Sequence, residues 1–212
     1  MSAIDTDGKL NRDYNVDWLK QNKFDTVLRY ISSGDQDKCI DAEELQAFLN
    51  ADIIVGIIYE LMGGSEGLPG SIDEKQGNAD GAYALSTLKA LGVPQGACVY
   101  FAVDTDVDNN DDINNYVIPY LQAAKLALGG YYRTGAYGCG ATCAAALNTA
   151  GCDKAMLANA TDWSGYNVFL ASGHAAIVQG VGPDLYDPDT IVDPAWGGFN
   201  ALAQNTKDES RA

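Results

Sequence analysis

Short apolar runs alternate with amphipathic segments along most of the chain. The runs FDTVLRY (24–30), DIIVGIIYE (52–60) and ACVYFAVD (97–104) are apolar on both faces, which is typical of parallel strands that are covered on both sides. Counted in the same way, the pattern predicts eight strands. The other five are 2–5, 133–138, 154–159, 175–180 and 190–193.

The segments between these runs predict helices. Residues 41–50 begin with Asp41 as an N-cap and carry Glu44 three places on, a variant of the capping box. Residues 74–91 end before Gly92, which favours a helix C-terminus there. Further helices are expected at 14–22, 111–128 (with a possible kink at Pro119) and 140–149, a weak one at 160–172, a loop at 180–190 and a last short helix at 199–206.

Eight strands with mostly helical crossovers predict a compact (β/α)8 TIM-type barrel, with degenerate helices after strands six and seven. The alternative is a doubly wound open sheet. Such a sheet usually has a Gly-rich turn after its first strand, and TDGKLN (6–11) is not such a turn. We expect one domain over residues 1–206 and a polar tail at 207–212.

Charge and composition narrow the range of partners. The chain has 29 acidic against 13 basic residues and a formal net charge of −16, which repels nucleic acids and anionic membrane surfaces. It has no apolar run of about 18 residues that could span a membrane. Its first residues, MSAIDTDGKL, lack the basic and apolar regions of a signal peptide. We therefore expect no nucleic-acid partner, no membrane insertion, and either a cytoplasmic protein, export without a leader, or a leader already removed.

The five cysteines do not form the even set of a disulfide framework. Cys98 lies in an apolar run and is predicted to be a core residue. Cys139, Cys143 and Cys152 lie close in sequence, so one bridge among them stays open. A zinc site would need more partners than His174, the only histidine, can add.

Acidic residues stand where the predicted strands end, and in a TIM barrel the chemistry lies at those ends. Glycoside hydrolysis needs such acids, because one carboxylic acid protonates the leaving oxygen while another stabilises or attacks the oxocarbenium-like centre. The candidates for catalysis are Asp5, Glu60, Asp104, Asp106 and Asp193.

Other polar and aromatic residues at the strand ends are candidate sugar contacts. They are Arg29, Tyr30, Tyr59, Tyr137, Asn159 and Gln179, with Trp163 and Trp196 as possible platforms after strands six and eight. Arg29 could instead pair with an acid of the rim, and either tryptophan could instead pack in the core.

The stretch YFAVDTDVDNNDD (100–112) carries the densest set of acids. In an extended chain Asp104 and Asp106 face the same way, and crowding of two carboxylates raises the pKa of at least one of them. An EF-hand calcium loop fits poorly, because Asn109 stands where that loop needs Gly and Asn115 where it needs Glu.

The motif GGSEG (63–67) matches the G-x-S-x-G nucleophile elbow, which places its serine directly at a strand end before a helix. Here Ser65 lies five residues beyond Glu60 and runs into LPGS, so a flexible loop over the site is the better interpretation.

Several of these segments, in order from about residue 3 to residue 200, resemble the glycoside-hydrolase-like barrels of bacteria and phages that are related to family 25 lysozymes. The most specific is LGVPQGACVYFAVDTD (91–106); FDTVLRYIS, IIVGIIYE and YRTGAYG are softer. The resemblance implies a (β/α)8-like barrel and a muramidase activity on peptidoglycan, with no metal or organic cofactor.

In family 25 lysozymes the fourth strand ends in Asp-x-Glu, and the Glu is the general acid. The resemblance places Asp106, one methylene shorter, in the position of that acid and Asp104 in the position of its partner. It also matches Asp5 and Asp193 to the acids of the first and last strands.

These residues predict cleavage of a β-1,4 link between amino sugars, with Asp106 protonating the leaving oxygen and Asp104 stabilising the positive ring or orienting the substrate's N-acetyl group. Two alternatives stay open. One is a non-catalytic barrel that binds glycans or a partner protein. The other is a metal-dependent hydrolase that uses the same acids to hold calcium or magnesium.

Overall fold

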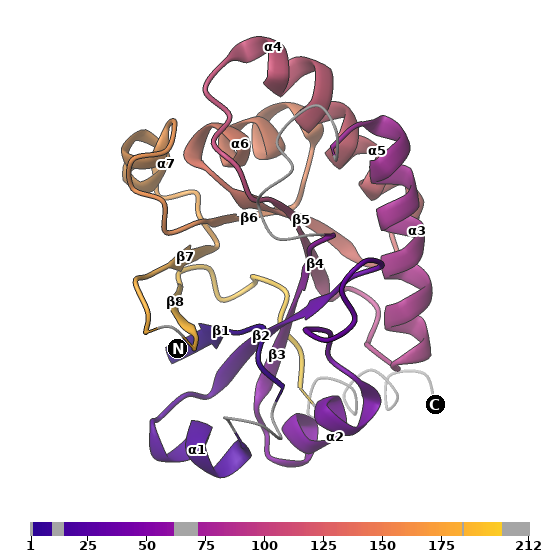
Figure 1. Ribbon diagram of the computed structural model, residues 1–212, viewed down its shortest axis with the longest axis vertical. Helices are drawn as coiled ribbons and strands as arrows, with labels where there is room; N and C mark the ends of the chain where they lie inside the picture. The colour runs from indigo at the N-terminus through magenta and orange to yellow at the C-terminus, as the bar shows by residue number, and fades with distance from the viewer. Residues whose placement is uncertain (1, 10–14, 62–71, 184, 201–212) are drawn as a thin grey trace.

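Eight strands close into one barrel in chain order in the computed structural model (Figure 1). The structure describes residues 2–9, 15–61, 72–183 and 185–200. The GGSEG motif, the polar tail and most of the expected last helix lie outside these residues. The strands are β1 (Ser2–Asp5), β2 (Thr26–Ile31), β3 (Ile54–Tyr59), β4 (Cys98–Val103), β5 (Arg133–Gly138), β6 (Lys154–Leu157), β7 (Ile177–Gln179) and β8 (Asp187–Ile191). The predicted TIM-type barrel is confirmed.

The last strand differs from the prediction in both position and direction. Strands β1 to β7 pair in parallel, whereas β8 pairs antiparallel with both β7 and β1. The chain between β7 and β8 is too short for a parallel crossover, which needs a dozen or more residues, so the strand must reverse. The predicted loop at 180–190 thus contains most of β8. The N-terminal end of β8 therefore lies where the other strands end.

Helices cover the outside of the barrel. They are α1 (Val16–Gln21), α2 (Ala42–Asn50), α3 (Glu74–Ala90), α4 (Asn110–Asp112), α5 (Ile118–Leu128), α6 (Gly140–Ala145) and α7 (Tyr166–Ser172), with π-helical turns η1 (Ile113–Val117) and η2 (Ala146–Ala150). Asp41 caps α2 as predicted, accepting a hydrogen bond from the Glu44 N–H at 2.9 Å. Pro119 lies in the first turn of α5, after η1, where its missing N–H is tolerated. None of the helices in the described ranges is long and apolar enough to cross a membrane.

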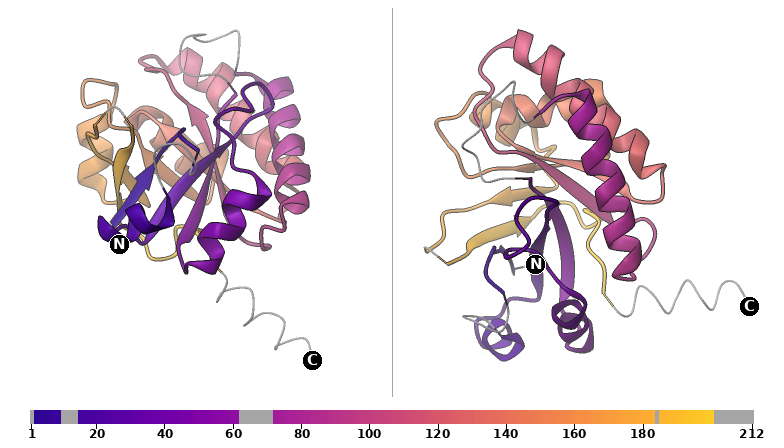
Figure 2. Two further views of the ribbon diagram at one scale, coloured as in Figure 1. Left: turned by 60° about the horizontal axis from the view of Figure 1, so that its bottom comes forward. Right: turned by 45° about the vertical axis from the view of Figure 1, so that its right-hand side comes forward.

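Helices α3 and α5 lie side by side on one flank of the barrel, away from the β7–β8 hairpin (Figure 2). Their backbones come close at Gly77, where an added Cβ would lie 2.1 Å from the carbonyl oxygen of Tyr120. This contact explains why α3 carries a glycine near its N-terminus, although glycine weakens a helix.

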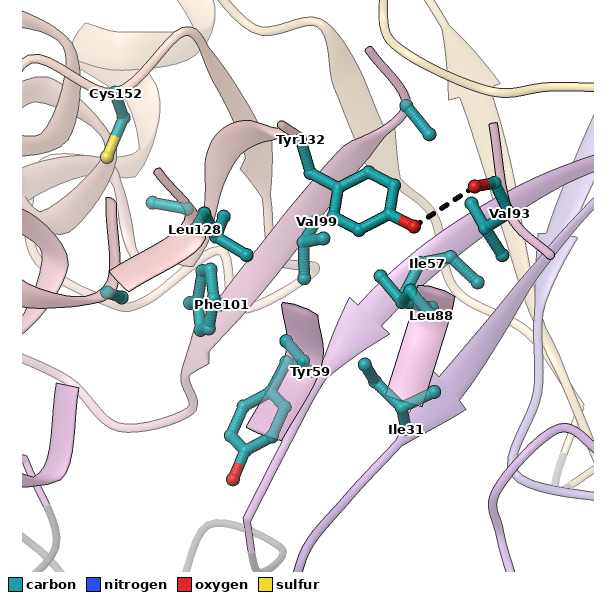
Figure 3. Close-up of a cluster of buried hydrophobic side chains, with 14 of the residues drawn as sticks. Ile31, Ile57, Tyr59, Leu88, Val93, Val99, Phe101, Leu128, Tyr132 and Cys152 are labelled. Carbon is teal, nitrogen blue, oxygen red and sulfur yellow. Dashed lines mark hydrogen bonds between the residues drawn. The ribbon is translucent and has the colours of Figure 1, made fainter. Parts of the chain in front are cut away.

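The sheet separates an apolar cluster inside the barrel from a large outer one, and a smaller third cluster packs α6 and α7 against β6. The inner cluster fills the barrel with side chains such as Leu28, Ile58 and Tyr100. The outer cluster packs the strands against the helices and includes Ile57 and Tyr59 of β3 and Leu88 of α3 (Figure 3). Neighbouring residues of one strand therefore face opposite sides, as the alternation of a strand requires.

All five cysteines are buried and free. The bridge that the sequence left open among Cys139, Cys143 and Cys152 is therefore not formed. Cys98 belongs to the inner cluster, which confirms its prediction as a core residue.

Candidate functional site

A cavity of about 360 Å³ opens at the end of the barrel where β1 to β7 end, which we call the mouth. It lies beside the chain that follows β1, β2 and β3 and beside the β7–β8 connection. Most of its lining is polar, and its volume falls in the range of small-molecule sites. The lining residues are Asp5, Thr6, Asp7, Tyr30, Asp35, Lys38, Glu60, Pro183, Leu185, Tyr186 and Asp187.

Asp5 is the most deeply buried acid of this cavity, with 3% of its surface exposed. Its Oδ1 accepts a hydrogen bond from the Tyr30 hydroxyl at 2.8 Å, and its Oδ2 accepts one from Gln179 Nε2 at 2.8 Å. Burial raises the pKa of Asp5 to about 7; these two hydrogen bonds oppose the rise, and the charges of Asp187 and Glu60 add to it. Asp5 therefore exchanges its proton near neutral pH.

Gln179, at the end of β7, fixes the arrangement of the neighbouring polar groups. Its Oε1 accepts hydrogen bonds from the Tyr137 hydroxyl at 3.1 Å and from the Asn159 N–H at 2.9 Å. Its Nε2 donates to Asp5 and, at 3.4 Å, to Asp187 Oδ2. Since both ends of the amide are occupied, its NH₂ is held toward the carboxylates.

Glu60 follows β3 and pairs with Lys38, whose Nζ lies 2.8 Å from Glu60 Oε2. The same ammonium group lies 5.2 Å from the centre of the Tyr30 ring, a cation–π distance. Lys38 was not predicted from the sequence, where a lone lysine in a polar loop gives no signal of its own.

Two further acids reach the barrel from β8, and the sequence prediction missed both. The register places Asp187 opposite Asp5 and Asp189 opposite Ala3, so both face the barrel interior. Neither carboxylate oxygen of Asp189 has a hydrogen-bond partner in the described part of the chain. Burial, and then the charges of Asp5 and Asp187, raise the pKa of Asp189 well above its usual value. The two-residue spacing of the acids in DPD (187–189) was the available signal.

Asp104 and Asp106 occupy different surroundings after β4. Asp104 is half-buried, and after burial its charge is the largest cause of the raised pKa of Tyr137, ahead of Asp5 and Glu60. Asp106 is exposed, and its Oδ1 accepts a hydrogen bond from the Ser164 N–H at 2.8 Å. This bond joins the chain after β4 to the loop after β6, where Trp163 lies half-buried.

The structure does not bring Arg29 and Tyr59 to the mouth. Both point outward, because Tyr30 and Ile58 beside them in the strands belong to the inner cluster. Arg29 is fully buried, and its Nε donates to Glu44 of α2 at 2.9 Å. The Tyr59 hydroxyl donates to Asp80 of α3 at 2.6 Å. The predicted placement of these two side chains at the mouth is therefore wrong.

Asp193 and Trp196 lie away from the mouth because β8 runs in the opposite direction to the other strands. Asp193 pairs at 2.5 Å with Lys154, the first residue of β6, and the start of a parallel strand is the end remote from the mouth. Trp196 is 2% exposed and packs in the barrel, where a Cβ on Gly56 would lie 2.5 Å from its ring. The predicted placement of Asp193 at the mouth is wrong, and of the two alternatives for Trp196 the structure shows packing in the core.

A metal centre would need several ligands to converge. Among the residues that the structure describes, no three His, Cys, Asp or Glu side chains are arranged to hold a metal ion.

Comparisons with known proteins agree with this architecture. Two proteins of Bacillus subtilis strain 168 are similar in sequence: FadG is 29% identical over 56% of this chain, and YbfG is 35% identical over 51%. The match spans only 21% of the length of FadG and 15% of that of YbfG.

Solved structures show the same fold. The Mycobacterium tuberculosis Tat-secreted protein Rv2525c, in complex with HEPES, superposes with a TM-score of 0.76 at 19% identity, over 93% of this chain and 98% of that one. The modular autolysin LytC from Streptococcus pneumoniae, in complex with a synthetic peptidoglycan ligand, gives 0.54 at 14% identity, over 89% and 46%.

A family model described as "Rv2525c-like, glycoside hydrolase-like domain" matches residues 17–208, which is most of the chain. The match includes β2 to β8 and therefore all of the mouth except the part that β1 supplies. The chain belongs to the family of Rv2525c-like, glycoside hydrolase-like domains.

Proposed function

We propose that the mouth of this barrel hydrolyses β-1,4 links between the amino sugars of peptidoglycan or a related polysaccharide. One observation carries the proposal: the carboxyl groups of Asp5, Glu60 and Asp187 line a single cavity at the mouth, and Asp104 follows β4 at the same end of the barrel. Acids gathered at one barrel end, one of them exchanging its proton near neutral pH, suit glycoside hydrolysis. Tyrosines among them offer flat faces to sugar rings.

Two comparisons support a cell-wall glycan as substrate. The family is described as glycoside hydrolase-like, and LytC, similar in fold, was solved with a synthetic peptidoglycan ligand. Peptidoglycan lies outside the cytoplasm, and Rv2525c, also similar in fold, is described as Tat-secreted. Export of this protein is therefore part of the proposal.

In the proposed reaction Asp106 protonates the leaving oxygen and Asp104 stabilises the positive charge that develops on the ring. Asp106 is exposed at the edge of the mouth, where a polymer can reach it, and the Ser164 N–H fixes its position. Asp5 and Glu60 act as positioning residues. Asp5 contacts Tyr30 directly, and Glu60 contacts Lys38. Gln179 hydrogen-bonds both Asp5 and Tyr137 and so links the two.

One observation favours binding without cleavage as a second function. A general acid has to reach the leaving oxygen with a carboxyl oxygen. The Oδ1 of Asp106 is instead engaged by the Ser164 N–H at 2.8 Å. A barrel that binds a glycan without hydrolysing it would have the same acidic mouth.

Digestion of purified peptidoglycan, with mass spectrometry of the released fragments, separates the two functions. The proteins compared are the wild type, Asp104→Asn, Asp106→Asn, and Asp111→Asn as a control that removes an exposed carboxylate of α4. We expect new reducing muramic-acid ends from the wild type and the control, and at least about a hundredfold fewer from the other two, the usual contribution of a general acid or of a group that stabilises transition-state charge. Sedimentation with peptidoglycan but no fragments from any protein would support binding alone.

A further inference from the structure

The charges of the cavity are strongly unbalanced. Among the described residues of the lining, five carry carboxylates, and the one ammonium group, that of Lys38, is already paired with Glu60 at 2.8 Å. The other acids of the lining are Asp5, Asp7, Asp35 and Asp187. An anionic sugar, such as one that carries a phosphate or a carboxylate, would be repelled by this lining.

A second, independent feature lies beneath these acids. Asp189 is 5% exposed, both of its oxygens lack a hydrogen-bond partner in the described ranges, and it shares the inward face of β8 with Asp187. A buried carboxyl without partners costs free energy. The neighbouring groups whose charges raise the pKa of Asp189 are Asp5 and Asp187, which are also acids. The site therefore has acceptors that face the cavity and its floor, and it needs donors or positive charge.

A protonated amine on a sugar would supply both. An ammonium group carries a positive charge and three N–H donors and has no acceptor, whereas an N-acetyl group offers one donor, one acceptor and additional bulk. The cavity, of about 360 Å³, is bordered by the Tyr30 and Tyr186 rings, against which a sugar ring can lie.

We propose that this cavity selects amino sugars whose amino group is free, so that the preferred glycan is a de-N-acetylated polymer. The inference rests on the proposed function, because it takes a glycan as the ligand. It adds that this glycan carries free amino groups. In this arrangement the ammonium group lies against Asp187 and Asp5, and its positive charge favours the ionised form of Asp189 below them.

Binding tests this directly, because it does not depend on cleavage. A β-1,4-linked glucosamine tetramer and its fully N-acetylated counterpart are titrated calorimetrically into the wild type near neutral pH, at equal ionic strength. We expect the glucosamine tetramer to bind about tenfold more tightly or better, since lowering the pKa of one carboxyl by one unit corresponds to a factor of ten.

Variants separate the cavity from the general acidity of the chain. Asp187→Asn and Asp189→Asn keep side-chain size and remove a charge, and each should reduce the preference, while Asp111→Asn should leave it unchanged. Melting curves confirm that each variant is folded. Equal or tighter binding of the N-acetylated tetramer overturns the proposal. The proposal is also overturned if Asp111→Asn weakens the preference for the glucosamine tetramer as much as Asp187→Asn does. The net charge of −16 would then explain the preference.

The two proposals fail in different ways. Cleavage of N-acetylated peptidoglycan without any preference for the free amine would leave the hydrolase intact and remove this inference. A preference for the free amine without cleavage of any polymer would remove the hydrolase and leave the cavity's selectivity.

Discussion

The buried carboxyl of Asp5 makes the stability of the folded barrel depend on pH in a defined direction. Its pKa is about 7 in the folded protein against an ordinary value of 3.8, so the folded state holds the proton more tightly than the unfolded chain does. Between these two values the unfolded chain has released the proton and the folded state has kept it. The contribution of Asp5 to the free energy of unfolding is therefore fully present below 3.8 and is lost as the pH rises toward 7.

The size of the effect follows from the shift. Each pKa unit corresponds to about 1.4 kcal/mol, so a rise from 3.8 to about 7 corresponds to about 4 kcal/mol. Asp5 is 3% exposed, so solvent does little to screen this contribution. For a protein whose total stability is of the order of 5–15 kcal/mol, the change is large.

The assay is urea unfolding, followed by circular dichroism, of the wild type and Asp5→Asn across this pH range. The amide of the variant does not titrate. Any stability lost with its hydrogen bond to Gln179 Nε2 is therefore the same at every pH. The readout is the difference in free energy of unfolding between the variant and the wild type. We expect this difference to change by about 4 kcal/mol over the pH range, in favour of the variant at the higher pH. A difference that stays constant from 3.8 to 7 would refute the reasoning.

As a control, Asp193→Asn should act in the opposite sense. Hydrogen bonding to Lys154 lowers the pKa of Asp193, so its contribution is present above the ordinary pKa and is lost as the pH falls. Its side chain is 35% exposed, so the effect should be small.

Three further substitutions test contacts that hold the barrel and its helices together. Arg29→Met removes the buried guanidinium that pairs with Glu44 and donates to the carbonyl oxygens of Thr6 and Lys38, and should lower the free energy of unfolding by about 3–5 kcal/mol in urea titrations; a loss below about 1 kcal/mol would contradict the assigned ion pair. Lys154→Met breaks the half-exposed pair with Asp193 and should cost less than about 1 kcal/mol in the same assay, and a larger loss would show that this pair is buried in solution. Gly77→Ala places a Cβ 2.1 Å from a carbonyl oxygen of α5 and should lower stability by about 1–3 kcal/mol, visible as a reduced Tm; an unchanged Tm would show that the two helices are not so close.

The sequence predicted best those strands that are marked by a long apolar run of their own. Strands β2, β3 and β4 are long apolar runs, and the pattern placed each to within a few residues. Strand β8 was predicted at 190–193, three residues later than it begins, because Asp187, Pro188 and Asp189 are poor strand formers, and its pairing with β1 and β7 is decided by tertiary contacts.

The sequence also did not predict to which face of a strand some side chains point. The prediction assigned both members of the neighbouring pairs Arg29–Tyr30 and Tyr59–Glu60 to the mouth, although successive residues of a strand point to opposite faces. In the structure Tyr30 and Glu60 border the cavity, while Arg29 and Tyr59 face α2 and α3. Alternation alone showed that one of each pair had to point outward, but the apolar flanks on both faces gave no signal for which one.

The identity of the acids at the mouth depended on the direction of the last strand. A parallel eighth strand would have brought Asp193 to the mouth, and the antiparallel one brings Asp187 instead. A hairpin could have been expected from the short chain between the last two apolar runs.

Chemical-shift mapping tests the central claim, that the acidic mouth is where this protein meets a glycan. Backbone amide spectra of the ¹⁵N-labelled protein are recorded during titration with soluble amino-sugar oligomers and peptidoglycan fragments. We expect the changes to gather at the ends of β1 to β5, at Gln179 and along the start of β8. Changes confined to the opposite end of the barrel, near Lys154 and Asp193, or to the cavity of about 980 Å³ beside α3 and α5 would contradict the account.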